Sequence, residues 1–409
     1  MRIVFLLTQD LTSPGGLGRY APLAKELVRA GHKVMILALH SHYAGLEPKM
    51  RAFTQDGARV RYVGQMHVRK LGSQKLYFGP ARLFWVVLCA TWQLFWNALN
   101  EPADIYYVGK PHPMNGVAGL LASRIHRKAL YVDCDDYEAG INRFAGKWQK
   151  AVIVFFETRL PQHAAWVTFI TDFMYKYLAQ TAHVPAERLI RLNNGVDRDR
   201  FTVMTSAVAE LRQSLKLNDK KIILYLGSMS LASHAVDLLL EAFALIVQKD
   251  SRAFLLLVGG GEDYETLQTQ AIQLGLTDQV LFVGRVSPDT VPLYYQLANV
   301  TVDPVRDDPG SAARFPLKIV ESLVAGVPVV TGDSGNRRQL LGNGAAGVLI
   351  KPDDRDELAA GILQVLQSST LAAQLSEQAR SMGEAYYWDT LVQTLVQHRA
   401  FTVRNSDAD

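Results

Sequence analysis

The stretch that decides the fold runs from Asp303 to Asn336 and reads DPVRDDPGSAARFPLKIVESLVAGVPVVTGDSGN. This pattern predicts the end of a strand, a loop, a helix, a second strand and a second loop. Pro316 suits the first turn of a helix, where its missing N–H would have no partner, and Gly326 followed by Pro328 ends the helix. We therefore expect a helix from about Pro316 to Ala325.

Two charged residues of this helix, Lys318 and Glu321, mark it as a candidate ligand site. They stand three positions apart and so share one face near the helix N-terminus, where free backbone N–H groups and the helix dipole favour an anion. A phosphate-bearing ligand would fit there. The alternative is a solvated pair between the two side chains, worth about a few tenths of a kcal/mol.

The same stretch resembles the family-4 glycosyltransferases of the GT-B fold, retaining enzymes that move a sugar from a nucleotide donor. That family carries two Glu residues here, followed by Ala-Gly-x-Pro-Val-Val. Glu321 occupies the second Glu position and residues 325–330 match the closing motif, but Ala313 stands at the first. The resemblance implies that Glu321 holds the donor ribose, and that the carboxylate that normally contacts the donor sugar is absent.

The residues before this stretch alternate between apolar runs and helical patterns, which predicts a parallel sheet. The expected strands are 221–227, 254–258, 280–283 and 299–302, and 327–331 and 347–350 follow the helix. Gly227 and Ser228 follow the first strand, and Gly260 and Gly261 follow the second. The resemblance places both loops beside the donor nucleotide.

The cations that would neutralise a donor diphosphate are not where the family pattern puts them. Members usually carry an Arg directly after the glycine of the first strand and a Lys further along, whereas this chain reads GSMSLASH from Gly227 to His234. A leaving diphosphate needs a nearby cation. We expect Lys318 to supply it, with Arg314 and Arg285 as alternatives, against the possibility that catalysis has been lost.

The N-terminal half begins with an apolar run from Arg2 to Thr8, which predicts a buried parallel strand. Gly15-Gly16-Leu17-Gly18-Arg19 then leads into a helix. Gly16 and Gly18 would allow a ligand to approach the backbone. The next strand, Lys33 to His40, has no acidic residue at its end to hold a ribose, so a dinucleotide cofactor is disfavoured.

Polar residues follow the strands expected at 105–108 and 130–132, at the strand ends where ligands of open α/β sheets collect. Related glycosyltransferases usually have a His beside the donor sugar after the second of these strands, and Asp135 stands in its place. His112 lies where the acceptor is expected, or is merely structural. The acidic residues between Asp133 and Glu138 lack a recognisable metal-ligand pattern, so we expect no metal.

Composition and charge place the chain among globular proteins, with 409 residues, 49% apolar and 20% charged. The net charge is +11 up to Arg200 and −7 beyond it, and a basic half suits an anionic partner. The Trp-rich segment Leu83–Leu99 is too short and polar for a confident membrane span, which leaves a core or interfacial helix. Two distant cysteines and no apparent signal peptide favour the cytoplasm.

Together these features predict two Rossmann-like, doubly wound parallel-sheet domains facing a cleft. The acceptor domain covers residues 1–200, with a terminal helix at about 385–409 that packs back on it, and the donor domain covers residues 201–384. We expect a retaining glycosyltransferase of envelope polysaccharide biosynthesis, with Glu321, Lys318 and Asp135 in catalysis.

The expected partners are a nucleotide-sugar donor, a glycan or lipid-linked acceptor and an anionic membrane surface. No nucleic acid and no cofactor are expected. A nucleotide-sugar epimerase and a non-catalytic subunit of another glycosyltransferase are the alternatives.

Overall fold

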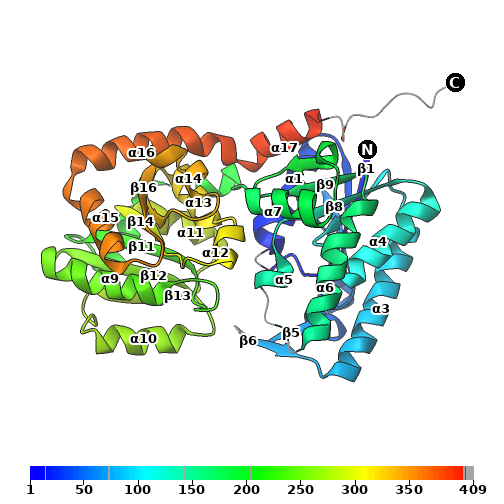
Figure 1. The fold of residues 1–409 in the computed structure, drawn as a ribbon, viewed down its shortest axis with the longest axis horizontal. Helices are drawn as coiled ribbons and strands as arrows, with labels where there is room; N and C mark the ends of the chain where they lie inside the picture. Colours follow the sequence, from blue (N-terminus) through cyan, green and yellow to red (C-terminus); the bar gives the residue numbers. More distant parts are fainter. Residues whose placement is uncertain are drawn as a thin grey trace. The chain divides into compact units, whose positions relative to one another are not determined.

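The computed structural model describes residues 1–13, 15–71, 74–141, 144, 146–202, 204–398 and 401. The last part of the helix predicted at about 385–409, from Thr402 to Asp409, lies outside them. The chain forms two compact units, one of Met1–Asn194 with Trp388–Asp409 and the other of Gly195–Tyr387 (Figure 1). Each unit is built on a parallel or mainly parallel sheet with helices on both faces, which confirms the predicted α/β class.

The first unit contains an eight-stranded sheet in the order β10-β9-β8-β7-β1-β2-β4-β3. Its strands are β1 (Arg2–Leu7), β2 (Lys33–His40), β3 (Ala52–Gln55), β4 (Ala58–Gln65), β7 (Ile105–Gly109), β8 (Ala129–Cys134), β9 (Trp166–Phe169) and β10 (Leu189–Arg191). All pairs are parallel except β3 with β4. The carboxyl ends of β1, β7 and β8 therefore lie next to one another.

Alternate residues of β1 enter two separate cores. Val4 and Leu6 pack beneath α3 (Pro80–Leu99) and α4 (Pro113–His126), whereas Ile3, Phe5 and Leu7 pack beneath α1 (Ala21–Arg29) and α17 (Trp388–Gln397). Each strand residue faces the opposite side from its neighbour, so the continuous apolar run predicted a strand buried on both faces. The remaining helices are α2 (Pro48–Arg51), α5 (Glu138–Ile141), α6 (Lys147–Arg159) and α7 (Asp172–Lys176).

The second unit contains a six-stranded, fully parallel sheet in the order β13-β12-β11-β14-β15-β16. Its strands are β11 (Lys221–Ser228), β12 (Ala253–Gly260), β13 (Val280–Gly284), β14 (Val300–Asp303), β15 (Val329–Gly332) and β16 (Gly347–Ile350). The strand order changes direction between β11 and β14. In such sheets ligands bind outside the carboxyl ends of the strands at this point.

Helices cover both faces of this second sheet. Its helices are α8 (Thr205–Ser214), α9 (Val236–Lys249), α10 (Tyr264–Gln273), α11 (Val291–Leu297), α12 (Pro309–Ala313), α13 (Leu317–Ala325), α14 (Arg337–Leu340), α15 (Arg355–Gln367) and α16 (Ser369–Gly383). Pro316 is the N-cap of α13, and Gly326, in the left-handed region at φ +69°, ends the helix. The helix predicted from Pro316 to Ala325 is thus correct to within one residue.

Among the described residues, no single helix is long and apolar enough to cross a membrane. Two successive helical segments, Arg355–Gln367 and Ser369–Tyr386, are long and apolar enough only when taken together, and the chain bends by 97° between them.

Candidate functional site

In the second unit, the last residues of β11 and β12 and the loops that follow them lie against each other at the carboxyl end of the sheet. Gly259 has a φ of +134°, and a Cβ on it would stand 1.9 Å from the carbonyl oxygen of Gly227. A Cβ on Gly261 would stand 2.3 Å from the carbonyl oxygen of Met229. Only glycine permits these approaches, so the two loops depend on the glycine run.

Lys318 extends from the first turn of α13 to these loops. Its Nζ donates to Oδ1 of Asp303, at the end of β14, over 3.1 Å and lies 4.6 Å from the centre of the Tyr225 ring. A Cβ on Gly227 would be 3.5 Å from the same Nζ. The ammonium group therefore lies beside the first glycine loop.

Asp303 is shared between Lys318 and a second cation, the buried Arg337 of α14. The Arg337 Nε donates to Oδ2 of Asp303 over 2.8 Å. Burial alone would raise the pKa of Asp303, but Arg337 and Lys318 hold it well below its usual value. Burial lowers the pKa of Lys318, and Asp303 opposes that shift. The three groups together carry net positive charge.

Glu321 has its own partner one turn along α13. Its Oε2 accepts a hydrogen bond from the hydroxyl of the buried Tyr295 over 2.8 Å. Burial raises the pKa of Glu321, although that hydrogen bond and the charges of Arg200 and Lys318 oppose the shift. Lys318 and Glu321 thus have separate partners instead of forming the solvated pair that was the alternative.

Arg314 and His234 border the same glycine loops. Nη1 of Arg314 donates to the carbonyl oxygen of Ser233, and the His234 ring lies 6.5 Å from that of Tyr225. Burial, together with the charges of Lys318 and Arg314, lowers the pKa of His234 to about 2. The imidazole is therefore neutral at physiological pH and can donate one hydrogen bond.

Arg285 and Ser228 lie at the outer side of the loops. Both are exposed, and a Cβ on Gly260 would stand 3.2 Å from Nε of Arg285. The carbonyl oxygen of Ser228 accepts a hydrogen bond from the Tyr225 hydroxyl over 2.6 Å. The fold thus brings the predicted donor-side residues together at one end of the sheet.

In the first unit, a buried ion pair holds the glycine loop to the sheet. Arg19 lies in the short π-helix η1 (Gly16–Tyr20), and its Nε and Nη2 each donate to an oxygen of Asp133 over 2.6 Å. The hydroxyls of Tyr20 and Thr168 donate to the same carboxylate over 3.0 and 2.6 Å. This carboxylate is therefore fully engaged by the protein.

Gly16 and Gly18 have different surroundings within η1. A Cβ on Gly16 would stand 2.4 Å from the carbonyl oxygen of Asp10, so the close approach at this residue is to the chain's own backbone. Gly18 is partly exposed. Their predicted contact with a ligand stays a prediction.

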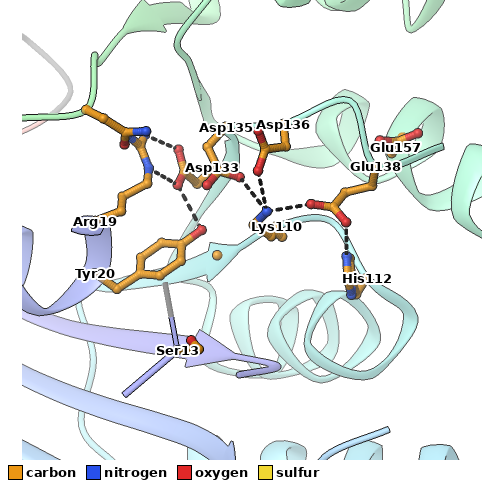
Figure 2. Close-up of polar contacts among 12 residues, drawn as sticks. Ser13, Arg19, Tyr20, Lys110, His112, Asp133, Asp135, Asp136, Glu138 and Glu157 are labelled. Atoms are coloured by element: carbon orange, nitrogen blue, oxygen red, sulfur yellow. Dashed lines mark hydrogen bonds and ion pairs between the residues drawn. The ribbon is translucent and has the colours of Figure 1, made fainter. Parts of the chain in front are cut away.

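Beside the Arg19–Asp133 pair, one ammonium group is surrounded by three carboxylates (Figure 2). Nζ of Lys110 lies 3.5 Å from Asp135 Oδ1, 2.7 Å from Asp136 Oδ2 and 2.5 Å from Glu138 Oε1. These three side chains have oxygens within 4.8 Å of one another. The Lys110 ammonium is the cation that lies among them. Lys110 itself has a φ of +63°, which costs about 1–2 kcal/mol in a residue with a Cβ.

Two buried carboxyl groups near Lys110 have raised pKa values. Burial raises the pKa of Asp135 to about 8, against the opposing charge of Lys110. Burial, with the nearby charge of Glu138, raises the pKa of Glu157 to about 8. Glu157 of α6 accepts a hydrogen bond from the backbone N–H of Ala139 over 3.3 Å, which ties α6 to α5.

His112, the residue expected near the acceptor, belongs to the same cluster. Its Nε2 lies 3.4 Å from Oε2 of Glu138. Although burial would raise the pKa of Glu138, Lys110 and His112 hold it well below its usual value. His112 therefore faces an ionised carboxylate.

The sequence prediction missed the direct partners of the residues that it named. The missed partners are Asp303, Arg337, Tyr295 and Lys110. Asp303 directly follows the strand predicted at 299–302, and Lys110 stands two residues after the strand predicted at 105–108, so the rule that ligands collect at strand ends was a usable signal for both. Arg337 and Tyr295 carry no such local signal.

Two family models match the chain, one in each unit. The model described as glycosyl transferase 4-like domain matches residues 15–195, and the model described as glycosyl transferases group 1 matches residues 208–382.

The chain is also similar to individual proteins of known sequence and structure. A GDP-mannose-dependent alpha-(1-6)-phosphatidylinositol monomannoside mannosyltransferase of Mycobacterium tuberculosis is 32% identical over 232 residues, which are 56% of this chain and 60% of the relative. Anabaena HepE, solved in complex with UDP and glucose, has a TM-score of 0.74 at 21% identity and covers 97% of this chain and 98% of its own. Sucrose-phosphate synthase from Thermosynechococcus elongatus has a TM-score of 0.76 at 19% identity, with the same coverage.

Proposed function

Since the chain belongs to the glycosyl transferases group 1 family, with the GT-B fold, we propose that it transfers a sugar, with retention of configuration, from a nucleotide donor to a glycan or lipid-linked acceptor of the cell envelope. HepE was solved with UDP and glucose, and the mycobacterial relative is named for GDP-mannose. Both names support a nucleotide sugar as the donor. The chain spans only 60% of the length of that relative.

One observation carries the proposal: two cations and the glycine loops lie side by side at the N-terminus of α13. No side chain caps this helix N-terminus, and Lys318 and Arg314 lie beside it. A helix N-terminus with neighbouring cations stabilises the charge that develops on a leaving diphosphate. Glu321, one turn further along, accepts hydrogen bonds from the donor ribose in this proposal.

In this proposal the cluster around Lys110 binds the acceptor. Burial raises the pKa of Asp135 to about 8, which favours its neutral form, and its Oδ1 accepts no hydrogen bond from the described residues. A neutral carboxyl group of this kind both donates to and accepts from a sugar hydroxyl. Positioning of the two substrates and stabilisation of the leaving group supply the catalysis, with the protein's own cations in place of a metal.

The proposed setting is the cytoplasm, at the inner face of a membrane. The described cysteines, exposed Cys89 and buried Cys134, are free thiols, which suits a reducing compartment. An acceptor carried on a lipid would be reached from that position.

The decisive experiment incubates the purified protein with a panel of UDP, GDP, ADP and dTDP sugars and follows the products by mass spectrometry. Transfer or slow hydrolysis of one donor supports a transferase. Isomerisation of the sugar would instead assign an epimerase, and nucleotide binding without turnover a non-catalytic subunit.

With the preferred donor, Lys318→Ala is expected to lower turnover roughly a hundredfold. Lys351→Ala, at a side chain that is 72% exposed, serves as the control and is expected to match the parent. Near-normal turnover of a folded Lys318→Ala variant would remove Lys318 from the diphosphate site.

A further inference from the structure

The outward face of α3 is apolar, where a surface helix is ordinarily polar. Five large side chains on this face are 44–65% exposed: Phe84, Trp85, Leu88, Trp92 and Trp96. The opposite face, with Ala90, Leu94 and Ala98, is buried in the core of the first unit. The exposed residues are thus a second apolar face on a helix that has already buried one.

The neighbouring helices continue this apolar surface. α4 packs against both α3 and α6, and the three helices lie side by side (Figure 1). Their exposed large apolar residues are Leu121 and Ile125 of α4 and Trp148, Val152 and Phe155 of α6, all 37–58% exposed. The outward faces of α3, α4 and α6 are called the three-helix surface below. It carries four of the six tryptophans of the chain.

The charged residues of the three-helix surface are all basic. α3 and α4 contain no Asp or Glu, and the single acidic residue of α6, Glu157, is buried. Five cations are exposed on these helices: Arg82, Arg124, Lys147, Lys150 and Arg159. In the described part of the chain, none of the five forms an ion pair with a carboxylate. The surface therefore combines exposed aromatic rings with unopposed positive charge.

We propose that the three-helix surface docks on an anionic phospholipid bilayer. Tryptophan favours the boundary between headgroups and acyl chains, because its ring is apolar and its N–H is polar. Lysine and arginine beside it are attracted to anionic headgroups. A second copy of the chain fits less well, since a two-fold contact would bring this surface, whose charged residues are all basic, against the same basic surface of the other copy. The proposal does not depend on the sugar-transfer activity.

Co-sedimentation of the full chain with phospholipid vesicles tests the proposal. Binding is expected to vesicles of phosphatidylglycerol with phosphatidylcholine, and much weaker binding to phosphatidylcholine alone. The triple variant Trp85→Glu, Trp92→Glu, Trp96→Glu is expected to lower the partition constant at least about tenfold. Ile272→Glu, at a side chain of the second unit that is 65% exposed, is the matched control and is expected to bind as the parent does.

A second variant isolates the charge and does not disturb the apolar face. Lys147→Gln with Lys150→Gln is expected to weaken binding about fivefold per lysine at low salt, and less as salt is added. These exposed substitutions keep the proposal testable if the triple variant does not fold.

Three outcomes would overturn the proposal. The first is no binding of the parent to anionic vesicles, and the second is equal binding to neutral and anionic vesicles. The third is a dimer in analytical ultracentrifugation that the triple variant abolishes, which would assign the surface to a second copy.

Discussion

The hydroxyl of Tyr295 holds the Glu321 carboxylate in one orientation, because it donates to Oε2 over 2.8 Å. Removing a charged hydrogen-bond partner costs about 1.5–3 kcal/mol. Glu321→Ala is therefore expected to weaken nucleotide binding roughly ten- to a hundredfold, measured by calorimetry with UDP and GDP. Tyr295→Phe keeps the Glu321 carboxylate and is expected to lose less nucleotide affinity than Glu321→Ala. Unchanged affinity in a folded Glu321→Ala variant would remove the ribose assignment.

Glu157 makes stability depend on pH in a direction opposite to that of most carboxylates. Its pKa rises from 4.5 to about 8 on folding, so the folded chain binds more protons than the unfolded chain between these values. The stability that Glu157 contributes is fully present below about pH 4 and is lost as the pH rises through 8, by roughly 5 kcal/mol at most.

The isosteric variant Glu157→Gln tests this dependence. The amide oxygen still accepts from the N–H of Ala139 but cannot ionise, so the melting temperature is expected to fall less between pH 5 and 9 than in the parent. The pKa of Asp135 is also raised to about 8, and this group is present in both proteins. The test is therefore the difference between the two proteins in the slope of melting temperature against pH. Parallel slopes would contradict the raised pKa of Glu157.

The pairing of β11 with β12 depends on the absence of a side chain at Gly259. Gly259→Ala would place a Cβ 1.9 Å from the carbonyl oxygen of Gly227, and the backbone would have to move. Gly275→Ala is the matched control, because Gly275 also has a positive φ but has nothing within 4 Å.

The control is expected to lose about 1–2 kcal/mol of unfolding free energy from its left-handed backbone. Gly259→Ala is expected to lose a further 1–3 kcal/mol or so from the clash, together with nucleotide affinity. Urea unfolding and calorimetry measure both effects. Equal losses in the two variants would show that the end of β12 does not need its close approach to Gly227.

The strands were predictable from sequence wherever an apolar run is long, as in β2, whose bounds match the prediction. Residues 60–63 of β4 were predicted as a strand, but its antiparallel partner β3 was missed, although Asp56-Gly57 between them is a strong turn signal. Both turn residues have positive φ, 50° and 81°. β10 has only three residues, too few for a periodic pattern. A second hairpin, β5 (Val68–Leu71) with β6 (Gln74–Tyr77), was also missed.

Of the candidate site residues, Lys318 and Asp135 could be named because they stand at the ends of predicted elements. Glu321 lies in the middle of α13 and was named from its resemblance to the family motif. Arg19 and Asp133 are 114 residues apart in sequence, and nothing local in a single sequence indicates that they pair. Protonation states were beyond prediction for the same reason, since the pKa of Asp135 depends on burial that only the folded unit creates.

The division into two units makes a prediction about the whole chain. If the second unit holds the donor, UDP or GDP should slow hydrogen exchange in the loops after β11 and β12 and in the first turn of α13. Exchange measured by mass spectrometry, with and without nucleotide, locates the protected segments. Protection confined to residues 1–194 would place the nucleotide on the other unit and contradict the proposed donor site.

The distribution of tryptophan has a consequence for spectroscopy. All six tryptophans lie in the first unit, because residues 195–387 contain none. Intrinsic fluorescence excited at the long-wavelength edge of the protein absorption band, where tryptophan absorbs and tyrosine does not, therefore reports on the first unit alone. Melting of the second unit, or a nucleotide bound to it, would be silent in that signal and would need tyrosine emission or calorimetry to be seen.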